Sequence, residues 1–120
     1  MSRDGAGFRV AGRDEVYVGD ILRVQEIEME APDGSRHERV TLRHPGAVGV
    51  LPLHDDNTVT LVRQYRVAID REIWEVPAGR RDVEDEPPRR TAARELAEEV
   101  GLEAAELVPL TRFHNSPGCS

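Results

Sequence analysis

The segment from residue 88 to residue 101, PRRTAARELAEEVG, constrains the fold most, because it carries the signals of both ends of a helix. Proline is favoured in a first helical turn, where Pro88 stands, and glycine just after the last turn, where Gly101 stands. Four apolar residues between them follow the i, i+3, i+4, i+7 rule: Ala93, Leu96, Ala97 and Val100. The sequence therefore predicts a helix from Pro88 to about Val100 with one apolar stripe.

Three glutamates fall on the side of this helix opposite the predicted stripe: Glu95, Glu98 and Glu99. Residues three and four apart are neighbours on a helix, so these carboxylates repel one another, and they also lie near the negative end of the helix dipole. Arg94 offsets part of the repulsion by pairing with Glu98. The remaining repulsion leaves two interpretations open, a solvated acidic surface or a site for a hard divalent cation.

The residues before position 45 predict a small antiparallel unit. Residues 16–29 alternate in part and predict one strand, and Asp33-Gly34 predicts a hairpin turn before a returning strand at residues 40–42. An isolated hairpin is marginal in water. We therefore expect residues 1–44 to be an appendage of a larger unit.

The rest of the chain alternates apolar segments with polar turns. Further strands are predicted at residues 47–53, at 58–64, in a short segment at 72–79 that Pro77 and Gly79 break, and within 104–114. The first two are almost continuously apolar, which is typical of a central sheet covered on both faces. Strands, one helix and a last strand predict a mixed α/β or α+β domain.

The composition bounds the function. At 120 residues the chain holds one domain, or one domain with a small appendage. No apolar run approaches the roughly 20 residues that a membrane span needs, and the N-terminus carries no apolar core of a secretory signal, so we expect a cytoplasmic protein. A net charge of −7 argues against a nucleic-acid partner, and an anionic substrate would need a cation to mediate its binding.

Together these residues resemble the Nudix hydrolase signature, Gly-x5-Glu-x7-Arg-Glu-apolar-x-Glu-Glu-x-Gly-apolar. Gly79, Glu86 and the segment RELAEEVGL from Arg94 to Leu102 match it. The sequence departs in one respect: six residues separate Gly79 from Glu86, and counting five would reach Asp85 instead. An additional residue in a polar loop is easily accommodated, so we take Glu86 as the match.

The flanking segments resemble the ADP-ribose pyrophosphatase branch of that family. They are IWEVPAG before the signature, RQYR upstream, and SPG after it, in which Pro117 lies sixteen residues beyond Gly101. Members of the branch carry an N-terminal β appendage through which they dimerise. The resemblance implies such an appendage at 1–44, a partial Nudix domain at 45–120, and a homodimer.

The activity implied by the resemblance is hydrolysis of ADP-ribose to AMP and ribose 5-phosphate with Mg²⁺, or with Mn²⁺ in its place. Glu95 and Glu99 would be the principal metal ligands, with the backbone carbonyl of Ala78 as a third. Glu98 would be an accessory metal ligand, or an acid that acts through the other ligands. Arg94 would hold the glutamates by ion pairing.

The remaining candidate residues have more local roles. By the same resemblance, Glu86 would anchor the loop to the helix, and Arg66 in RQYR would contact the diphosphate, because a guanidinium suits phosphate geometry. A surface arginine at a strand end is the alternative for Arg66. Trp74 is a candidate to border the nucleotide, although a lone tryptophan on a strand is more often a core residue.

Two alternatives to this activity stay open. The substrate could be another nucleoside diphosphate sugar, or the chain could be a non-catalytic nucleotide-binding or dimerisation module. In the family a loop beyond the SPG segment supplies the carboxylate proposed as general base, and a second helix closes the fold. We therefore expect the 120 residues to be a fragment of a longer product, rather than an enzyme with a different base or an impaired one.

Overall fold

The computed structural model describes residues 6–120 of the chain. They form two compact units: one joins the chain up to His44 with Arg112–Ser120, and the other is Pro45–Thr111. The predicted functional division, an appendage at 1–44 and a Nudix-type domain at 45–120, stays a prediction. None of the helices in the described part of the chain is long and apolar enough to cross a membrane.

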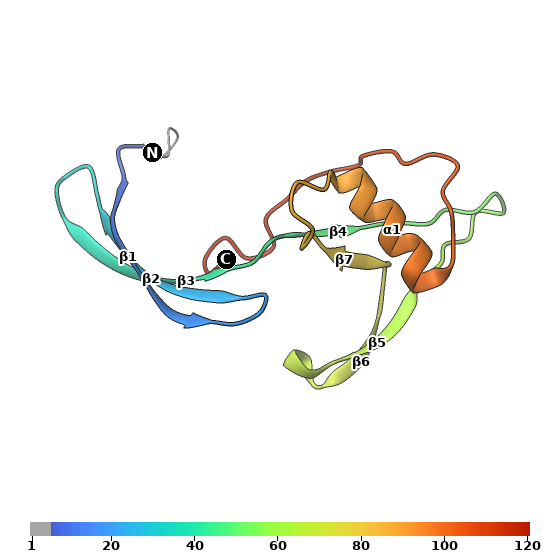
Figure 1. Ribbon diagram of the computed structural model, residues 1–120, viewed down its shortest axis with the longest axis horizontal. Coiled ribbons are helices and arrows are strands. Elements are labelled where there is room, and N and C mark those ends of the chain that lie inside the picture. Colours follow the sequence, from blue (N-terminus) through green and yellow to red (C-terminus); the bar gives the residue numbers. More distant parts are fainter. Residues whose placement is uncertain (1–5) are drawn as a thin grey trace. The chain divides into compact units, whose positions relative to one another are not determined.

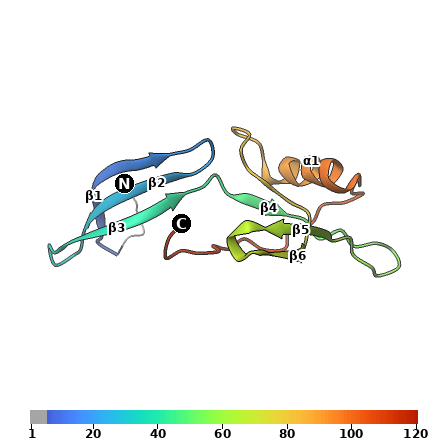
Figure 2. The same ribbon diagram turned by 90° about the horizontal axis from the view of Figure 1, so that it is seen from below.

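The first unit is a three-stranded antiparallel sheet in the order β1-β2-β3 (Figure 2). Its strands are β1 (Arg9–Val18), β2 (Arg23–Glu30) and β3 (Arg36–Arg43). The predicted hairpin turn at Asp33-Gly34 is confirmed: Gly34 has a φ of 83°, and the Asp33 carboxylate accepts bonds from the backbone N–H and the hydroxyl of Ser35. This turn sets β2 and β3 in register.

The prediction of a single strand at residues 16–29 is wrong, because the chain turns in its middle. The Gly19 N–H donates to the Leu22 carbonyl at 2.8 Å, and β1 and β2 separate there. A Cβ at position 19 would lie close to the Tyr17 ring and to the Leu22 carbonyl, so glycine fits this turn without displacing either. The local turn residues Gly19 and Asp20 outweigh the partial alternation of the segment.

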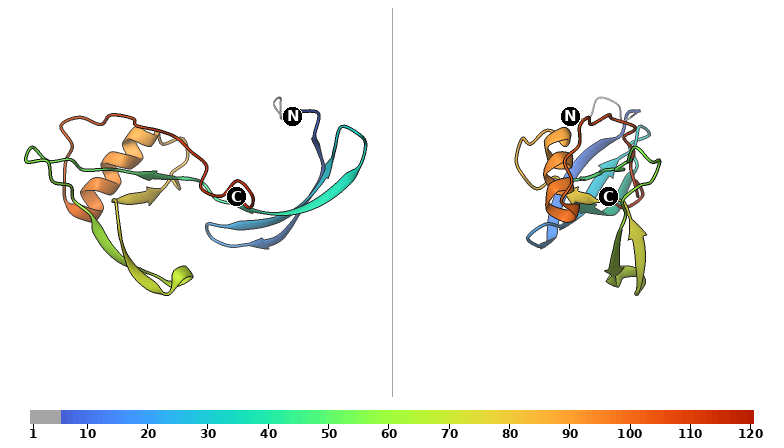
Figure 3. Two further views of the ribbon diagram at one scale, coloured as in Figure 1. Left: turned by 180° about the vertical axis from the view of Figure 1, so that it is seen from behind. Right: turned by 90° about the vertical axis from the view of Figure 1, so that its right-hand side faces the viewer.

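The C-terminal residues belong to this first unit. The Leu42 N–H at the end of β3 donates to the Cys119 carbonyl at 2.7 Å. Figure 3 shows the C-terminus beside this end of β3. Pro117 therefore lies in a turn next to the three-stranded sheet.

The second unit holds two small antiparallel sheets and the helix (Figure 1). Its elements are β4 (Ala47–Gly49), β5 (Val62–Arg66), the short 3-10 helix η1 (Val67–Ile69), β6 (Arg71–Glu75), β7 (Ala78–Arg80) and α1 (Pro88–Val100). Strand β4 pairs with β7, and β5 pairs with β6 as a hairpin. Helix α1 packs against β7 and β4.

The predicted helix is confirmed at both ends. Pro88 opens α1, and Gly101 ends it in the left-handed region with φ 66°, its N–H bonded to the Ala97 carbonyl. The helix packs through a small core of Val50, Ala92 and Leu96, against which five partly buried residues pack: Val48, Val100, Leu102, Ala104 and Leu107. This core holds α1 over β7.

Two of the four residues predicted to form the apolar stripe of the helix are packed, and the other two are exposed. Leu96 is buried and Val100 is half-buried, but Ala93 and Ala97 are exposed. Thr91 and Ala92 are buried instead, so the packed face is rotated toward Glu95, whose side chain is only 14% exposed. Ala93 and Ala97 gain little from burial, which lets the larger Leu96 and the bonds of Thr91 set the orientation.

The predicted covered central sheet is also wrong in this structure. Of residues 47–53 only 47–49 form a strand, residues 58–64 form one only from Val62, and 104–114 form none. Residues 72–79 divide at Val76-Pro77 into β6 and β7. Several apolar side chains predicted to be buried are exposed: Leu51, Leu53, Val59 and Leu61.

Candidate active site

Two glutamates of α1 reach the short strand β7. The Glu95 side chain lies directly against Gly79, where a Cβ at position 79 would collide with its carboxyl group. The Glu99 Oε2 accepts a bond from the Ala78 N–H at 3.2 Å. These residues are four apart, one turn of helix, so they project side by side toward neighbouring residues of β7. The break at Pro77 and the absence of a side chain on Gly79 make this approach possible.

Arg94 is the hub of an ion-pair network beside these glutamates. Its Nη2 lies 3.0 Å from Glu86 Oε1, and its Nη1 lies 3.1 Å from Glu95 Oε1 and 3.5 Å from Glu98 Oε2. Asp82 stands at the edge of the network, at 4.0 Å. One guanidinium therefore links the 81–87 loop to the glutamates of the helix.

Glu86, rather than Asp85, occupies the position that holds the loop to the helix. It receives bonds from Arg94 and, at 2.8 Å, from the hydroxyl of the fully buried Thr91. Asp85 takes a left-handed conformation with φ 57° in a turn where the Glu86 N–H donates to the Val83 carbonyl. Aspartate tolerates this conformation better than most residues, so the turn accommodates the extra residue of the loop.

The bonds of this network lower the pKa of Glu86, first through the hydrogen bond from Arg94 and then through that from Thr91. The hydrogen bond to Glu86 is also the main reason why the pKa of Arg94 rises above its ordinary value. Both shifts favour the charged forms. The pair is therefore fully ionised at neutral pH.

Arg66, the predicted diphosphate contact, pairs with Glu75. Its Nε lies 2.8 Å from Glu75 Oε2 and its Nη2 lies 2.9 Å from Glu75 Oε1. This bidentate bond raises the pKa of Arg66, and the negative charge of Glu99 adds to the effect. Val62 and Gln64 of the same strand line a shallow depression together with Arg63 and Glu99. The strand that carries Arg66 thus lies beside Glu99.

Trp74 lies on the face of the β5–β6 hairpin opposite the face that carries Arg66. It pairs in register with Arg63, and side chains alternate along a strand, so both point to the face opposite Arg66 and Glu75. The Arg63 guanidinium lies 5.8 Å from the centre of the Trp74 ring, and Trp74 is 65% exposed. The alternative interpretation of Trp74 as a core residue is therefore wrong.

The other predicted residues are placed as follows. Glu98 is 60% exposed and contacts the network only through Arg94. Gly101 ends the helix, and Pro117 belongs to the first unit rather than to the unit that holds α1. The structure thus brings Gly79, Glu86, Arg94, Glu95 and Glu99 together with Ala78.

Two residues of the site were missed in the sequence. Thr91 lies one turn before Arg94, and its helical spacing to the signature could have indicated a partner for Glu86. Glu75 lies on the strand opposite Arg66, but only the register of β5 and β6 reveals that they meet. The role of Glu75 therefore depends on a contact that spacing along the chain does not encode.

The donors at β7 fit a hard cation. Carboxylate and carbonyl oxygens are the ligands that Mg²⁺ prefers, and Glu95 and Glu99 both lie at Ala78 and Gly79. Within residues 6–120 no group of three His, Cys, Asp or Glu side chains gathers to hold an ion. A metal here would therefore use two carboxylates and depend on backbone oxygen or water for its other ligands.

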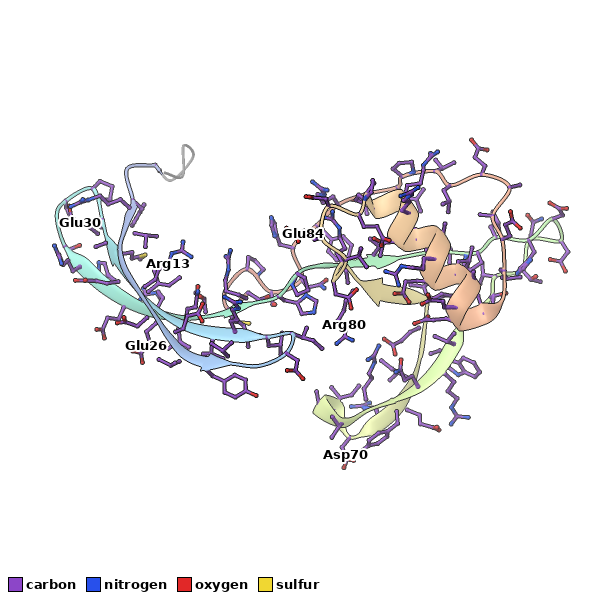
Figure 4. All side chains as sticks on the ribbon, in the orientation of Figure 1. Arg13, Glu26, Glu30, Asp70, Arg80 and Glu84 are labelled. Atoms are coloured by element: carbon purple, nitrogen blue, oxygen red, sulfur yellow. The ribbon has the colours of Figure 1, made fainter. Side chains whose placement is uncertain are left out.

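Figure 4 shows two charged residues that border this region. Arg80 lies at the end of β7, and Glu84 projects from the loop between β7 and α1. Asp70 marks the far tip of the β5–β6 hairpin, where the Tyr65 hydroxyl donates to its carboxylate at 2.6 Å. Charged side chains of both signs thus surround the elements that carry the site.

Comparison with known proteins relates this chain to one domain family. The NUDIX domain family matches residues 43–119. A methanol dehydrogenase activator of Bacillus methanolicus is 38% identical over 105 residues, which cover 88% of this chain and 56% of that protein. An ADP-ribose pyrophosphatase of Bacillus subtilis (strain 168) is 36% identical over 110 residues, 92% of this chain and 59% of that protein.

A solved structure, described as that of an ADP compounds hydrolase, superimposes with a TM-score of 0.79 at 27% identity. The match covers 93% of this chain and 60% of that one. The chain thus spans little more than half the length of these relatives. It shares their α+β fold, with the signature helix packed on the strand that bears Gly79. On the family match and these identities, this chain belongs to the Nudix family.

Proposed function

We propose that this protein hydrolyses the pyrophosphate bond of ADP-ribose, giving AMP and ribose 5-phosphate, in a reaction that depends on Mg²⁺. The observation that carries the proposal is the convergence of Glu95 and Glu99 on the Ala78-Gly79 segment. Two carboxylates one helical turn apart, both at a strand break, are suited to a divalent ion.

The metal would be held by Glu95, Glu99 and the Ala78 carbonyl, with Mn²⁺ as an alternative to Mg²⁺. When bound, it would neutralise diphosphate oxygens and lower the pKa of a bound water. Glu98 would serve as an accessory acid at the exposed edge. These assignments are supported by the donor chemistry of the residues.

The other residues would act by holding the two ligands. Arg94 and Glu86 form a bonded pair that fixes the middle of α1 to the preceding loop, and Arg94 also contacts Glu95. A ligand carboxylate whose neighbours restrain it loses less freedom on binding an ion. Arg66 would contact a phosphate group, and Trp74 would border the nucleotide only from the opposite face of the hairpin.

The choice of ADP-ribose is supported by the name of the Bacillus subtilis relative, and a related nucleoside diphosphate sugar is the alternative substrate. A substrate panel separates the two. The protein is incubated with Mg²⁺ and ADP-ribose, GDP-mannose or UDP-glucose, and the nucleoside monophosphate released is measured by chromatography. We expect the highest kcat/KM for ADP-ribose.

The matched control is Glu99→Gln, which keeps the size of the side chain and removes its charge. We expect this variant to lose activity while keeping its fold. If the protein releases no AMP and Glu99→Gln behaves identically, the proposal of catalysis by this chain is wrong.

A second candidate is a non-catalytic nucleotide-binding or dimerisation module. It is favoured by the finding that, among residues 6–120, no group of three His, Cys, Asp or Glu side chains is placed to hold a metal ion. Calorimetry distinguishes the two: binding of Mg²⁺ and ADP-ribose without release of AMP supports the module.

We further propose a homodimer in the cytoplasm. The support is the exposure of five large apolar side chains on the two faces of the three-stranded sheet: Val10, Val16, Tyr17, Val18 and Val40. A second copy of the chain would cover part of this apolar area. Sedimentation equilibrium should give twice the monomer mass, and a chain that begins at Pro45 should sediment as a monomer.

A further inference from the structure

The β5–β6 hairpin carries two arginine–glutamate pairs on opposite faces. The register Arg63↔Trp74 and Val62↔Glu75 assigns Arg63, Trp74 and Glu72 to one face, and Arg66 and Glu75 to the other. Arg63 Nη2 lies 2.7 Å from Glu72 Oε2, and Arg66 Nε lies 2.8 Å from Glu75 Oε2. The Arg63–Glu72 ion pair can therefore serve as a control for the Arg66–Glu75 ion pair on the same hairpin.

The two pairs differ in their surroundings. Glu75 is 25% exposed, whereas Glu72 is 51% exposed. The face with Arg66 also contains Val62 and Gln64, which line the depression together with Glu99, and Arg63 of the other face lines it as well. Arg66 and Glu75 thus share a face with two of the residues that meet Glu99 at this depression, and the negative charge of Glu99 acts on the Arg66 guanidinium.

The geometry of the Arg66 pair leaves part of the guanidinium available. Glu75 accepts from Nε and Nη2, which uses one N–H of each. A guanidinium has five N–H donors in a rigid fork, so both N–H groups of Nη1 and one of Nη2 are left. Those donors form the second edge of the fork, the edge that a phosphate oxygen pair can contact.

We propose that Glu75 is a positioning residue for the substrate: it holds the Arg66 guanidinium by one edge, so that the other edge is presented to the diphosphate. This inference rests on the proposed function. A free arginine side chain samples many rotamers, and part of the ordering cost of binding is removed when a partner already fixes it. Glu75 restricts the conformations of the Arg66 side chain without contacting the substrate itself.

The test measures ADP-ribose binding by calorimetry in the presence of Mg²⁺, on the full 120-residue chain. Glu75→Ala should weaken binding by about three- to tenfold, the range expected for losing the order of one side chain. Glu75→Gln keeps an acceptor for Arg66 and should restore part of the affinity. Glu72→Ala removes the matched pair on the other face and should leave the affinity unchanged.

A double-mutant cycle separates positioning from a structural role. In an Arg66→Ala background, Glu75→Ala should have no further effect on binding, because the residue that it positions is gone. An equal loss in both backgrounds, or tighter binding by Glu75→Ala, overturns the inference.

Failure of the proposed function gives a different result. If the unmodified chain does not bind ADP-ribose while Mg²⁺ still raises its Tm, the substrate assignment is wrong, and the positioning role falls with it. If the unmodified chain binds and Glu75→Ala matches Glu72→Ala, only the inference about Glu75 is wrong.

Discussion

The carboxyl group of Glu95 occupies the space beside Gly79 that a β-carbon at position 79 would need. The glycine of the signature and the first glutamate of its helix are therefore complementary in shape. Glu99, one turn later, bonds to the N–H of the neighbouring Ala78. This relationship explains why a glycine stands fifteen residues before Arg94 in this chain.

Gly79→Ala should abolish the stabilisation that Mg²⁺ gives, because the added methyl group displaces the Glu95 carboxylate. For the unmodified chain, the free energy of unfolding should rise by about 2.7 kcal/mol when Mg²⁺ is 100 times its Kd. For the variant we expect no rise. Without metal, the overpacking should cost about 1–3 kcal/mol at most. Thermal unfolding with and without Mg²⁺ measures both quantities.

Gly118→Ala is the control for that substitution. A Cβ at position 118 meets nothing within 4 Å, and the residue is in the first unit. It should leave the response to Mg²⁺ unchanged. A Gly79→Ala chain that Mg²⁺ stabilises as much as the unmodified one would show that Glu95 is not a metal ligand.

Thr91→Val should destabilise the protein although it preserves the shape of the side chain. Thr91 is fully buried and its hydroxyl donates to Glu86 at 2.8 Å. A hydrogen bond to a charged group contributes about 1.5–3 kcal/mol, and Arg94 still satisfies Glu86 in the variant, so we expect a loss near the lower value. Urea unfolding should show a lower midpoint with an unchanged m-value. Thr91→Ser, which keeps the hydroxyl, should lose less than Thr91→Val.

The stability of the chain should fall in acid, partly through Glu86. Arg94 and Thr91 lower the pKa of Glu86 from its ordinary value of 4.5. Between the folded pKa and 4.5 the unfolded chain binds more protons, so stability increases with pH through that window and is complete above it. Below the folded pKa this contribution is lost.

Glu86→Gln should flatten that dependence without removing it, because Arg66 lowers the pKa of Glu75 and Arg9 lowers that of Glu30. Urea unfolding between about pH 3 and about pH 6, which spans the usual carboxyl pKa range, measures how steeply the free energy of unfolding depends on pH. Glu84→Gln, at an exposed position of the same loop, is the control and should keep the slope of the unmodified chain. Identical slopes for both variants would contradict a role for Glu86.

The helix and the family signature that it carries could be predicted because their signals are local. Pro88 and Gly101 mark its ends within one turn, and the signature spacing identifies Glu86 despite the additional loop residue. The burial of its faces could not be predicted from periodicity alone. Ala93 and Ala97 fit an apolar stripe, but Thr91 bonds to Glu86 and Glu95 packs on Gly79, which turns the helix toward those contacts.

The strands were harder to predict because pairing is not local. A turn at Gly19 interrupts a segment that partly alternates, and residues 47–53 have the composition of one buried strand but change partners, from β7 at 47–49 to Val59 at Leu53. Similarly, Glu75 meets Arg66 only because β5 and β6 pair in one register. A shift of one residue would send the two side chains to opposite faces.

Leu96→Ala should be the most damaging single change in the second unit. Leu96 is 2% exposed and belongs to the small core with Val50 and Ala92 that holds α1 on β4 and β7. Truncating a buried leucine costs about 2–5 kcal/mol, a large share of the stability of a small unit. Leu110→Ala removes the same atoms from a side chain that is 77% exposed and should change stability by less than about 0.5 kcal/mol. The midpoints of urea unfolding compare the two variants. Because the positions of Glu95 and Glu99 depend on how α1 packs on β4 and β7, Leu96→Ala should also weaken the stabilisation by Mg²⁺. Equal midpoints for both variants would mean that α1 is held by something other than this core.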